Sequence, residues 1–337
     1  MISSINRRTF LSSAAALAAA AAAPLAAQSP RRSRRLIPSD PPMSTLLPST
    51  RYFEIDSAIA GARYAIWVST PGGYEQAKTA RFPVLYLPDG NSAAPSFATR
   101  MPYLQIDPIN PIQPFIMVCI GYPPEDAPKA LAVRARDLLP PREPLPPGVE
   151  QGMDATVQAG LLDRAGANLY LHNLRNPAGD KFLAFLTDEL HGQIASAYRV
   201  DDSNGAGLFG FSYGGLFALY AALRRTPLLR KIGAGSPGLL PGQSRVFEMY
   251  RAEATANADY SGRILHVNFM ERELTYPSVY QPLVAAGTAE FITLAGTRPL
   301  SGLSFSSRII PEDSHITGSG PSFSSFLRAA YSARPRS

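Results

Sequence analysis

The sequence has a single cysteine, Cys119, among its 337 residues, so no disulfide can form within the chain. Cys119 lies inside the apolar run PFIMVCIGY, which indicates a buried and unreactive thiol. Cysteine and histidine residues do not cluster at the spacing of metal ligands, and we expect neither a metal nor an organic cofactor. No internal repeat is visible. Any chemistry of this chain is therefore expected from its ordinary side chains.

The N-terminus lacks an apolar run long enough to remain in a membrane. Residues 14–23 are apolar, but a spanning helix needs about 20 such residues. Arg7 and Arg8 precede this run and small residues close it near Ala27, which is typical of a twin-arginine export signal. We expect residues 1–27 to be cleaved, leaving a periplasmic or secreted protein without stable membrane insertion. An Ala-rich tail or a membrane anchor is the alternative.

Basic charge is concentrated before the expected fold begins. The chain carries a formal net charge of +6, and part of it comes from the leader and from the cluster RRSRR at residues 31–35. This cluster lies in a segment rich in proline and serine, residues 28–48, which is typical of a flexible lead-in. Nothing beyond this segment indicates a nucleic-acid-binding surface, so no nucleic-acid partner is expected.

The remaining residues, 49–333, show the alternation of strands and helices that is typical of a single α/β domain. Residues 52–71 are expected to form an antiparallel hairpin that turns near Gly61. FPVLYL and PFIMVCIGY are apolar throughout, as in central strands of a parallel sheet covered by helices on both faces. A proline-rich insertion near residues 138–148 is expected to be a surface excursion that shapes access to a site. The oligomeric state is not readable from these patterns.

The sequence GFSYG at residues 210–214 matches the G-x-S-x-G pattern of a nucleophile elbow. It stands between an expected strand at residues 206–209 and an expected helix at residues 216–223, where this chemistry requires it. The glycines leave room for a sharp turn, and the N-terminus of the helix stabilises a developing oxyanion. We therefore predict that Ser212 is a nucleophile rather than part of a structural Gly-Ser turn.

A serine nucleophile needs a base, and in this fold class the histidine follows the serine in the chain. Only His266 and His315 do so. His266 lies in the strand-like ILHVNFM, where a histidine of the sheet is the usual explanation. His315 lies in IIPEDSHITGSG, a loop between a strand and the final helix, and we predict His315 as the base. His172 and His191 precede the serine and are expected to be structural or exposed.

The acid that orients the base is expected just after the strand that precedes the histidine loop. Glu271 is the favoured candidate in NFMEREL, Glu273 is the second, and Asp259 is an outsider. Asp313 is expected to cap or solvate the histidine loop instead. A working Ser-His dyad without an acid is a further alternative.

An oxyanion hole needs two backbone N–H donors. Tyr213 follows the serine and is expected to supply the first donor. The turn after FPVLYL, at Gly90 and Asn91, is the natural source of the second, with a plain β-turn as the alternative reading.

The chain resembles the putative esterase family of α/β-hydrolases over roughly residues 52–327. This family includes the enterochelin and salmochelin esterases and relatives of S-formylglutathione hydrolase. The resemblance implies an α/β-hydrolase fold with Ser212 as nucleophile, His315 as base and the oxyanion hole around Gly90 or Asn91. It rests on the stretches FPVLYLPDGN, RARDLLPP, FLAFLTDELHGQIASAYRVD, GFSYGGLFALYAAL and EDSH.

We expect a serine carboxylic ester hydrolase that acts on a small-molecule ester through an acyl-enzyme. Siderophore trilactones and acylated carbohydrates are the two substrate classes that fit an exported esterase of this kind. Arg134 and Arg136 could attract an anionic substrate, although exposed arginines are usually only solvated. The alternatives are an acyltransferase with the same serine and histidine, and a non-catalytic ligand-binding module on a hydrolase scaffold.

Overall fold

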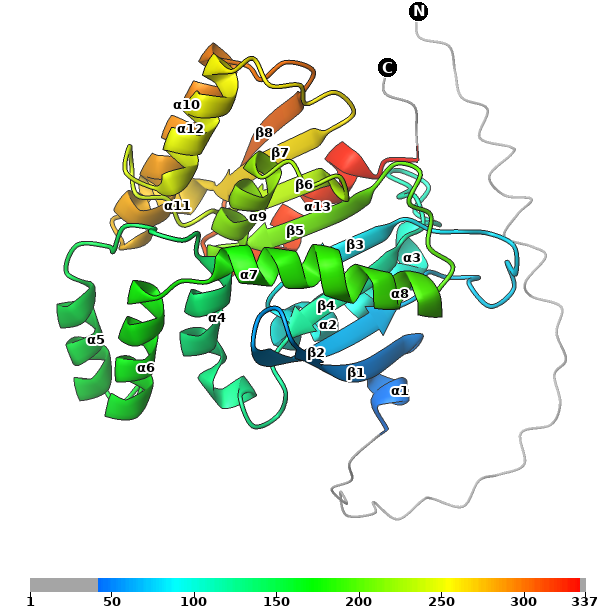
Figure 1. The fold of residues 1–337 in the computed structure, drawn as a ribbon, viewed down its shortest axis with the longest axis horizontal. Coiled ribbons are helices and arrows are strands. Elements are labelled where there is room, and N and C mark those ends of the chain that lie inside the picture. Colours follow the sequence, from blue (N-terminus) through cyan, green and yellow to red (C-terminus); the bar gives the residue numbers. More distant parts are fainter. Residues whose placement is uncertain (1–41, 334–337) are drawn as a thin grey trace, which may run out of the picture. The chain divides into compact units, whose positions relative to one another are not determined.

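The computed structural model describes residues 42–333, which form an eight-stranded sheet in the order β1-β2-β4-β3-β5-β6-β7-β8 (Figure 1). β2 pairs antiparallel with β1 and with β4, and the other neighbours are parallel. This sheet agrees with the expected fold class. The strands are β1 (Thr50–Ser57), β2 (Ala62–Ser69), β3 (Val84–Leu87), β4 (Ile116–Gly121), β5 (Ala206–Phe211), β6 (Leu229–Gly235), β7 (Ile264–Met270) and β8 (Ser304–Ile310).

The expected signal peptide, residues 1–27, and most of the lead-in, residues 28–48, lie outside the described residues. The end of the lead-in forms a short helix, α1 (Met43–Leu46), and a turn at residues 47–49 leads into β1. Among residues 42–333, no helix is long and apolar enough to cross a membrane.

The N-terminal hairpin forms where the sequence predicts it. Ser57 pairs with Ala62, so β1 and β2 are joined by a four-residue turn, residues 58–61. Gly61 closes this turn with φ of +63°, a left-handed conformation that glycine adopts without a steric penalty.

The central strands are buried on both faces, as their apolar sequences indicate. Every residue of β3 and β4 is buried. Side chains alternate across a strand, so Val84 and Tyr86 pack into one core and Leu85 and Leu87 pack into the other. Cys119 of β4 is buried and unpaired, in agreement with the expectation of an inert thiol.

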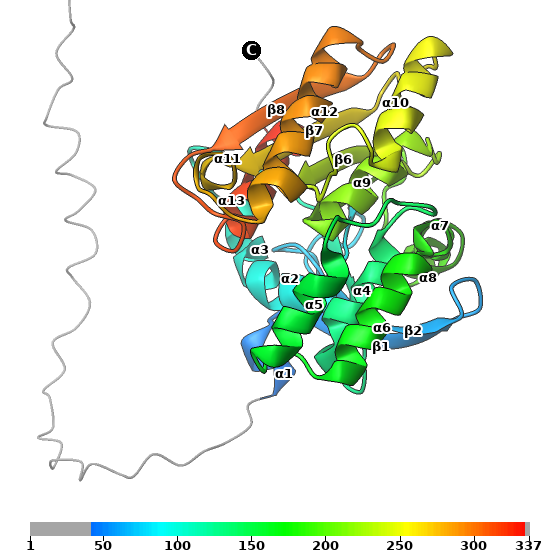
Figure 2. The same ribbon diagram turned by 90° about the vertical axis from the view of Figure 1, so that its left-hand side faces the viewer.

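Helices cover both faces of the sheet (Figures 1 and 2). One core holds Phe97, Met101, Phe323 and Phe326 of α2, α3 and α13, and the larger core holds the apolar faces of α4, α6–α10 and α12. The helices are α2 (Gly90–Phe97), α3 (Met101–Leu104), α4 (Ala130–Leu138), α5 (Val149–Gln158), α6 (Arg164–Arg175), α7 (Gly179–Ala184), α8 (His191–Ala197), α9 (Tyr213–Leu223), α10 (Arg245–Thr255), α11 (Glu271–Thr275), α12 (Ala286–Thr297) and α13 (Ser319–Ala330). Two π-helical turns, Phe185–Leu190 and Gln281–Ala285, continue into α8 and α12, and short 3-10 turns lie at Ala98–Arg100 and Ala127–Lys129.

The strand order changes direction between β3 and β5. From β3 the chain crosses to β4 on one side, and from β5 it crosses to β6 on the other side. Loops diverge at such a switch point and leave a crevice at the carboxyl ends of the strands, where ligands bind in open α/β sheets. The Gly90–Asn91 turn follows β3, and the elbow follows β5, so both predicted site segments lie at this switch point.

Candidate active site

A cavity of about 770 Å³ lies at the carboxyl ends of β3 and β5. Ser212 and His315 both line it. Further walls come from the turn after β3, from α6, from the proline-rich insertion and from residues 279–284. The insertion, residues 139–148, forms no helix or strand between α4 and α5. Its position on the cavity wall agrees with the expected role in access.

Ser212 stands on a strained turn. Its φ of 60° and ψ of −120° lie outside the regions that a serine ordinarily adopts, and such strain concentrates at functional sites. The turn is fixed by its backbone: the Ser212 N–H donates to the carbonyl of Gly235, and the N–H of Gly238 donates to the carbonyl of Ser212. A Cβ atom on Gly210 would lie 1.9 Å from the carbonyl oxygen of Gly214, so only glycine fits there. The strand, sharp turn and helix of a nucleophile elbow are therefore all present.

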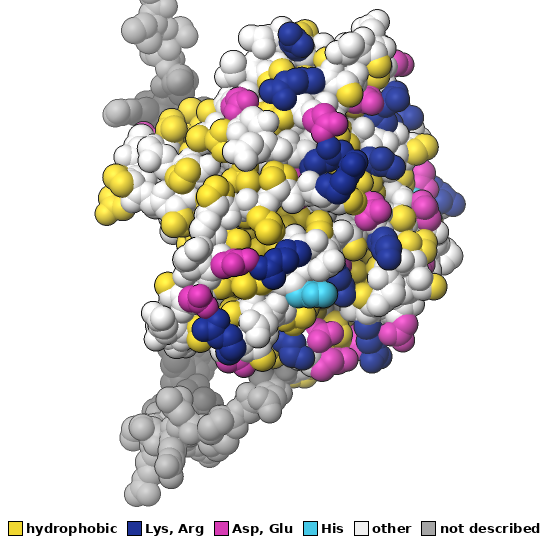
Figure 3. Space-filling view, turned by 60° about the vertical axis from the view of Figure 1, so that its left-hand side comes forward, with side chains coloured by type: hydrophobic (Ala, Val, Ile, Leu, Met, Phe, Trp, Pro, Cys, Tyr) yellow, Lys and Arg dark blue, Asp and Glu magenta, His cyan; other side chains and the backbone are white. Residues whose placement is uncertain are grey.

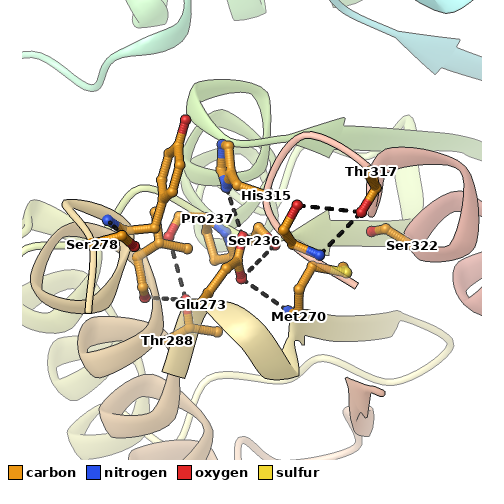
Figure 4. A network of polar contacts seen from close by, with 12 residues as sticks. Ser236, Pro237, Met270, Glu273, Ser278, Thr288, His315, Thr317 and Ser322 are labelled. Atoms are coloured by element: carbon orange, nitrogen blue, oxygen red, sulfur yellow. Dashed lines mark hydrogen bonds and ion pairs between the residues drawn. The ribbon is translucent and has the colours of Figure 1, made fainter. Parts of the chain in front are cut away.

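His315 is held by a buried carboxylate (Figure 4). Its Nδ1 lies 2.6 Å from Oε1 of Glu273, which is 1% exposed. Oε2 of Glu273 accepts hydrogen bonds from the hydroxyl of Ser236 and from the backbone N–H of Met270. Tyr280 stacks on the imidazole with a centroid separation of 4.1 Å. Because Nδ1 faces an acceptor, it carries the proton and Nε2 is left as the basic nitrogen.

Glu271, the acid that the sequence favoured, does not contact His315. Its carboxylate accepts a hydrogen bond from the backbone N–H of Glu312 instead. Both glutamates belong to α11, which begins directly after β7, and residues two apart on a helix point in nearly opposite directions. The third helical residue, Glu273, therefore turns back toward the end of the strand and reaches the histidine, whereas Glu271 faces the loop. The contacts therefore favour Glu273 over Glu271 as the partner of His315.

The other acidic candidates are engaged elsewhere. Asp259 lies before β7, at the opposite end of the strand from the cavity, and accepts the backbone N–H of Ser261. Asp313 accepts a hydrogen bond from the hydroxyl of Thr317 within the histidine loop, as expected of a residue that caps it.

The remaining histidines lie away from the cavity wall. His191 contacts the hydroxyl of Tyr86 and the carboxylate of Asp202, and His172 is exposed on α6. His266 is buried in β7, where its two ring nitrogens contact the hydroxyls of Ser306 and Ser325. The structural reading of His266 agrees with these contacts.

Acidification is expected to destabilise the fold through His266. Burial, with smaller contributions from Arg308 and Arg328, lowers the pKa of His266 from 6.5 to about 4. The unfolded chain therefore binds the proton more readily. The contribution of the neutral ring to the free energy of unfolding is fully present above about pH 6.5. It is lost as the pH falls toward 4, by up to about 1.4 kcal/mol per pH unit. Urea unfolding at several pH values should show a flatter pH dependence for His266→Gln than for the wild type; equal slopes would contradict this role.

The two segments expected to form the oxyanion hole both lie at the cavity. Tyr213 is the first residue of α9, and the first N–H groups of a helix have no partner within it. Gly90 and Asn91 begin α2 after Asp89, which adopts a left-handed φ of 59°. Asn91 lines the cavity, and its side chain bonds the N–H and the carbonyl of Tyr122, which fixes this turn against the end of β4. Gly90 packs so closely on β4 that a Cβ atom would lie 2.7 Å from its backbone.

The two arginines considered for anion attraction are both paired with carboxylates. Nε and an Nη of Arg134 lie 2.7 and 2.8 Å from the two oxygens of Asp89. Arg136 makes a similar two-point contact with Asp137, a carboxylate that is 2% exposed. Arg134 lines the cavity, whereas Arg136 does not.

Three side chains of the site are not indicated by the motifs. Ser236 follows β6 at the same edge of the sheet as Ser212, and that position could have indicated it. Tyr280 lies in a segment without a motif, and Glu143 lies in the proline-rich insertion, whose sequence indicated a role in access but no particular side chain. Among residues 42–333, no three histidine, cysteine, aspartate or glutamate side chains come together as a metal site.

Comparison with known proteins gives a family for part of the chain. Residues 145–267 match a family model described as "Putative esterase". The ferri-bacillibactin esterase BesA of Bacillus subtilis (strain 168) is 27% identical over 197 residues, which cover 57% of this chain and 60% of BesA. Residues 145–267 are thus similar to the putative esterases. These matches confirm the resemblance drawn from the motifs. The chain spans about three fifths of the length of BesA.

Solved structures show the same fold over most of the chain. The BES protein from Bacillus cereus superposes with a TM-score of 0.64 at 19% identity and covers 90% of this chain and 98% of its own. The siderophore hydrolase EstB from Aspergillus nidulans gives a TM-score of 0.65 at 20% identity, over 90% of this chain and all of EstB. The expected α/β-hydrolase fold is confirmed.

Proposed function

We propose that this protein is a serine carboxylic ester hydrolase that works through an acyl-enzyme. One observation carries the proposal: the strained Ser212 shares a cavity with His315, and a buried carboxylate, Glu273, holds Nδ1 of that histidine. The relationship to putative esterases supports the same reaction. Ser212, His315 and Glu273 correspond to a nucleophile, a base and an acid that orients the base.

In the proposed reaction, Nε2 of His315 accepts the proton of the Ser212 hydroxyl as its oxygen attacks the ester carbonyl. Glu273 fixes the tautomer through Nδ1 and stabilises the imidazolium that forms. The N–H of Tyr213 and an N–H from the first turn of α2, at Gly90 or Asn91, bind the oxyanion. The tetrahedral intermediate then collapses, His315 protonates the departing alcohol, and water attacks the acyl-serine by the same steps to release the acid.

Siderophore trilactones and acylated carbohydrates are the proposed substrate classes. The names of BesA and EstB support the first class, because they describe esterases or hydrolases of siderophores. We also propose export through the twin-arginine pattern at Arg7 and Arg8, which would place the enzyme in the periplasm or outside the cell.

Rapid mixing with excess 4-nitrophenyl acetate tests the acyl-enzyme. Formation of the acyl-enzyme should release one equivalent of 4-nitrophenolate per active site. Acid quenching at that stage should give an acetylated peptide that contains Ser212. Acetate should be the final product even with an added alcohol. Acetyl transfer to the alcohol in place of hydrolysis would favour an acyltransferase, and a folded sample that releases no nitrophenolate would favour a binding module.

A further inference from the structure

The cavity wall is predominantly apolar beyond the reacting groups. Figure 3 shows hydrophobic side chains gathered around a hollow across the middle of this side of the molecule. They come from the loop and helices on both sides of the elbow, so an ester bound at Ser212 meets apolar surface in several directions. These side chains include Leu131, Leu145, Leu174, Leu240, Val279 and Ile316.

The guanidinium on this wall is already paired with a carboxylate. Arg134 is the only lysine or arginine among the described residues that line the cavity. Its two-point contact with Asp89 neutralises it, and its guanidinium lies 5.1 Å from the ring centroid of Tyr213. An anionic group of a substrate would have to displace the Asp89 carboxylate to use this arginine.

A second carboxylate on the same wall, Glu143, forms no ion pair with the described residues. Glu143, from the proline-rich insertion, accepts the backbone N–H of Arg245 at 3.1 Å. The guanidinium of Arg245 is bonded to Glu248. Burial raises the pKa of Glu143 to about 7, against the lowering effect of its contacts with Ser244 and Arg245. The described wall thus carries two carboxylates, Asp89 and Glu143, and one guanidinium.

We infer that the cavity selects esters that place no charge within it, and that Glu143 disfavours esters that bring an anionic group into the cavity. The inference rests on the proposed ester hydrolysis. An anion that enters this apolar cavity loses hydration and finds no free counter-charge, and the Glu143 carboxylate repels it whenever it is ionised. Such selection by repulsion is a common source of specificity.

This inference separates the proposed substrates. Uncharged acyl groups on a carbohydrate, and a lactone whose phenolic groups are protonated, are compatible with the wall. A metal complex of a catecholate siderophore carries net negative charge and is disfavoured. The arginines do not alter this expectation, because Arg134 and Arg136 are both paired with carboxylates.

Three esters of equal chain length test the inference on the wild-type enzyme at pH 8: 4-nitrophenyl hexanoate, the mono-4-nitrophenyl ester of adipic acid, and the same ester with its free carboxylate converted to an amide. We expect kcat/KM for the carboxylate ester to lie about 10- to 100-fold below that of the amide ester, the matched uncharged polar control. Equal or faster hydrolysis of the carboxylate ester would overturn the inference while leaving ester hydrolysis intact. If the folded protein hydrolyses none of the three, the proposed function itself fails.

Glu143→Gln tests whether the charge of Glu143 disfavours anionic esters. This substitution keeps the size and an oxygen acceptor for the Arg245 N–H but removes the charge, so the ratio between the amide and carboxylate esters should narrow several-fold. Thermal unfolding establishes that the variant is folded, and Glu150→Gln, on the exposed face of the adjoining α5, is the matched control whose ratio should equal the wild-type ratio. A wild-type ratio in folded Glu143→Gln would overturn the role of Glu143.

Discussion

Ser212→Ala is expected to reduce kcat for 4-nitrophenyl esters by about 10³- to 10⁶-fold. The substitution removes the only atom that forms the acyl bond, and the oxyanion donors and the cavity then act alone. The fold should survive, because Ser212 is only half-buried and its backbone hydrogen bonds do not involve the side chain. Steady-state kinetics and circular dichroism measure the two effects.

Ser196→Ala is the matched control for this experiment. Ser196 is an exposed residue of α8 and is not among the residues that line the cavity, so its loss should change kcat/KM by less than about threefold. Near wild-type hydrolysis by folded Ser212→Ala would contradict the assigned nucleophile.

Glu273→Gln is expected to lower kcat by about 10³- to 10⁴-fold, whereas Glu271→Gln should remain within about threefold of the wild type. An amide at position 273 cannot stabilise the imidazolium, and its N–H₂ group can impose the wrong tautomer on His315. The two glutamates are two residues apart and undergo the same chemical change, so each variant is the control for the other.

Stability must be separated from catalysis in this pair, because Glu273 accepts three hydrogen bonds in a buried position. Thermal unfolding of each variant makes that separation, and Glu273→Asp, which keeps the charge, should retain more activity than Glu273→Gln. A large loss in Glu271→Gln together with an active Glu273→Gln would reverse the assignment.

The fold follows from the sequence to a large extent because its signals are local. The apolar runs that become β3 and β4 are short, end in turn residues and have no polar face. Such runs predict strands that are buried on both faces of a parallel sheet. The positions of Ser212 and His315 in the fold can also be predicted from the sequence, because each lies between a recognisable strand and a recognisable helix.

The sequence favoured Glu271, whereas the structure brings Glu273 to His315, because the direction of each glutamate depends on where a helix begins. Strand β7 ends at Met270, and the chain turns into α11 without a connecting loop, so the direction of each glutamate is set by helical rotation. Met270, at the N-cap, is not one of the residues that usually mark the start of a helix, although Glu273 three residues later accepts its backbone N–H.

The residues that form the cavity wall could not be predicted from the sequence, for a different reason. The pair Arg134 with Asp89 joins residues 45 apart, and Tyr280 reaches His315 from a segment that carries no motif. Such contacts arise only when the loops of different strands meet at the switch point. Arg134 could therefore be read as an anion receptor from the sequence, although the fold neutralises it.

Labelling with a fluorophosphonate followed by peptide mass spectrometry tests the central claim most directly. The reagent reacts with a serine only when a base activates it, so it reports on Ser212, His315 and Glu273 without knowledge of the substrate. We predict a single adduct on Ser212 that is abolished in His315→Ala and strongly slowed in Glu273→Gln. A folded wild-type protein that forms no adduct, or an adduct on another serine, would contradict the account.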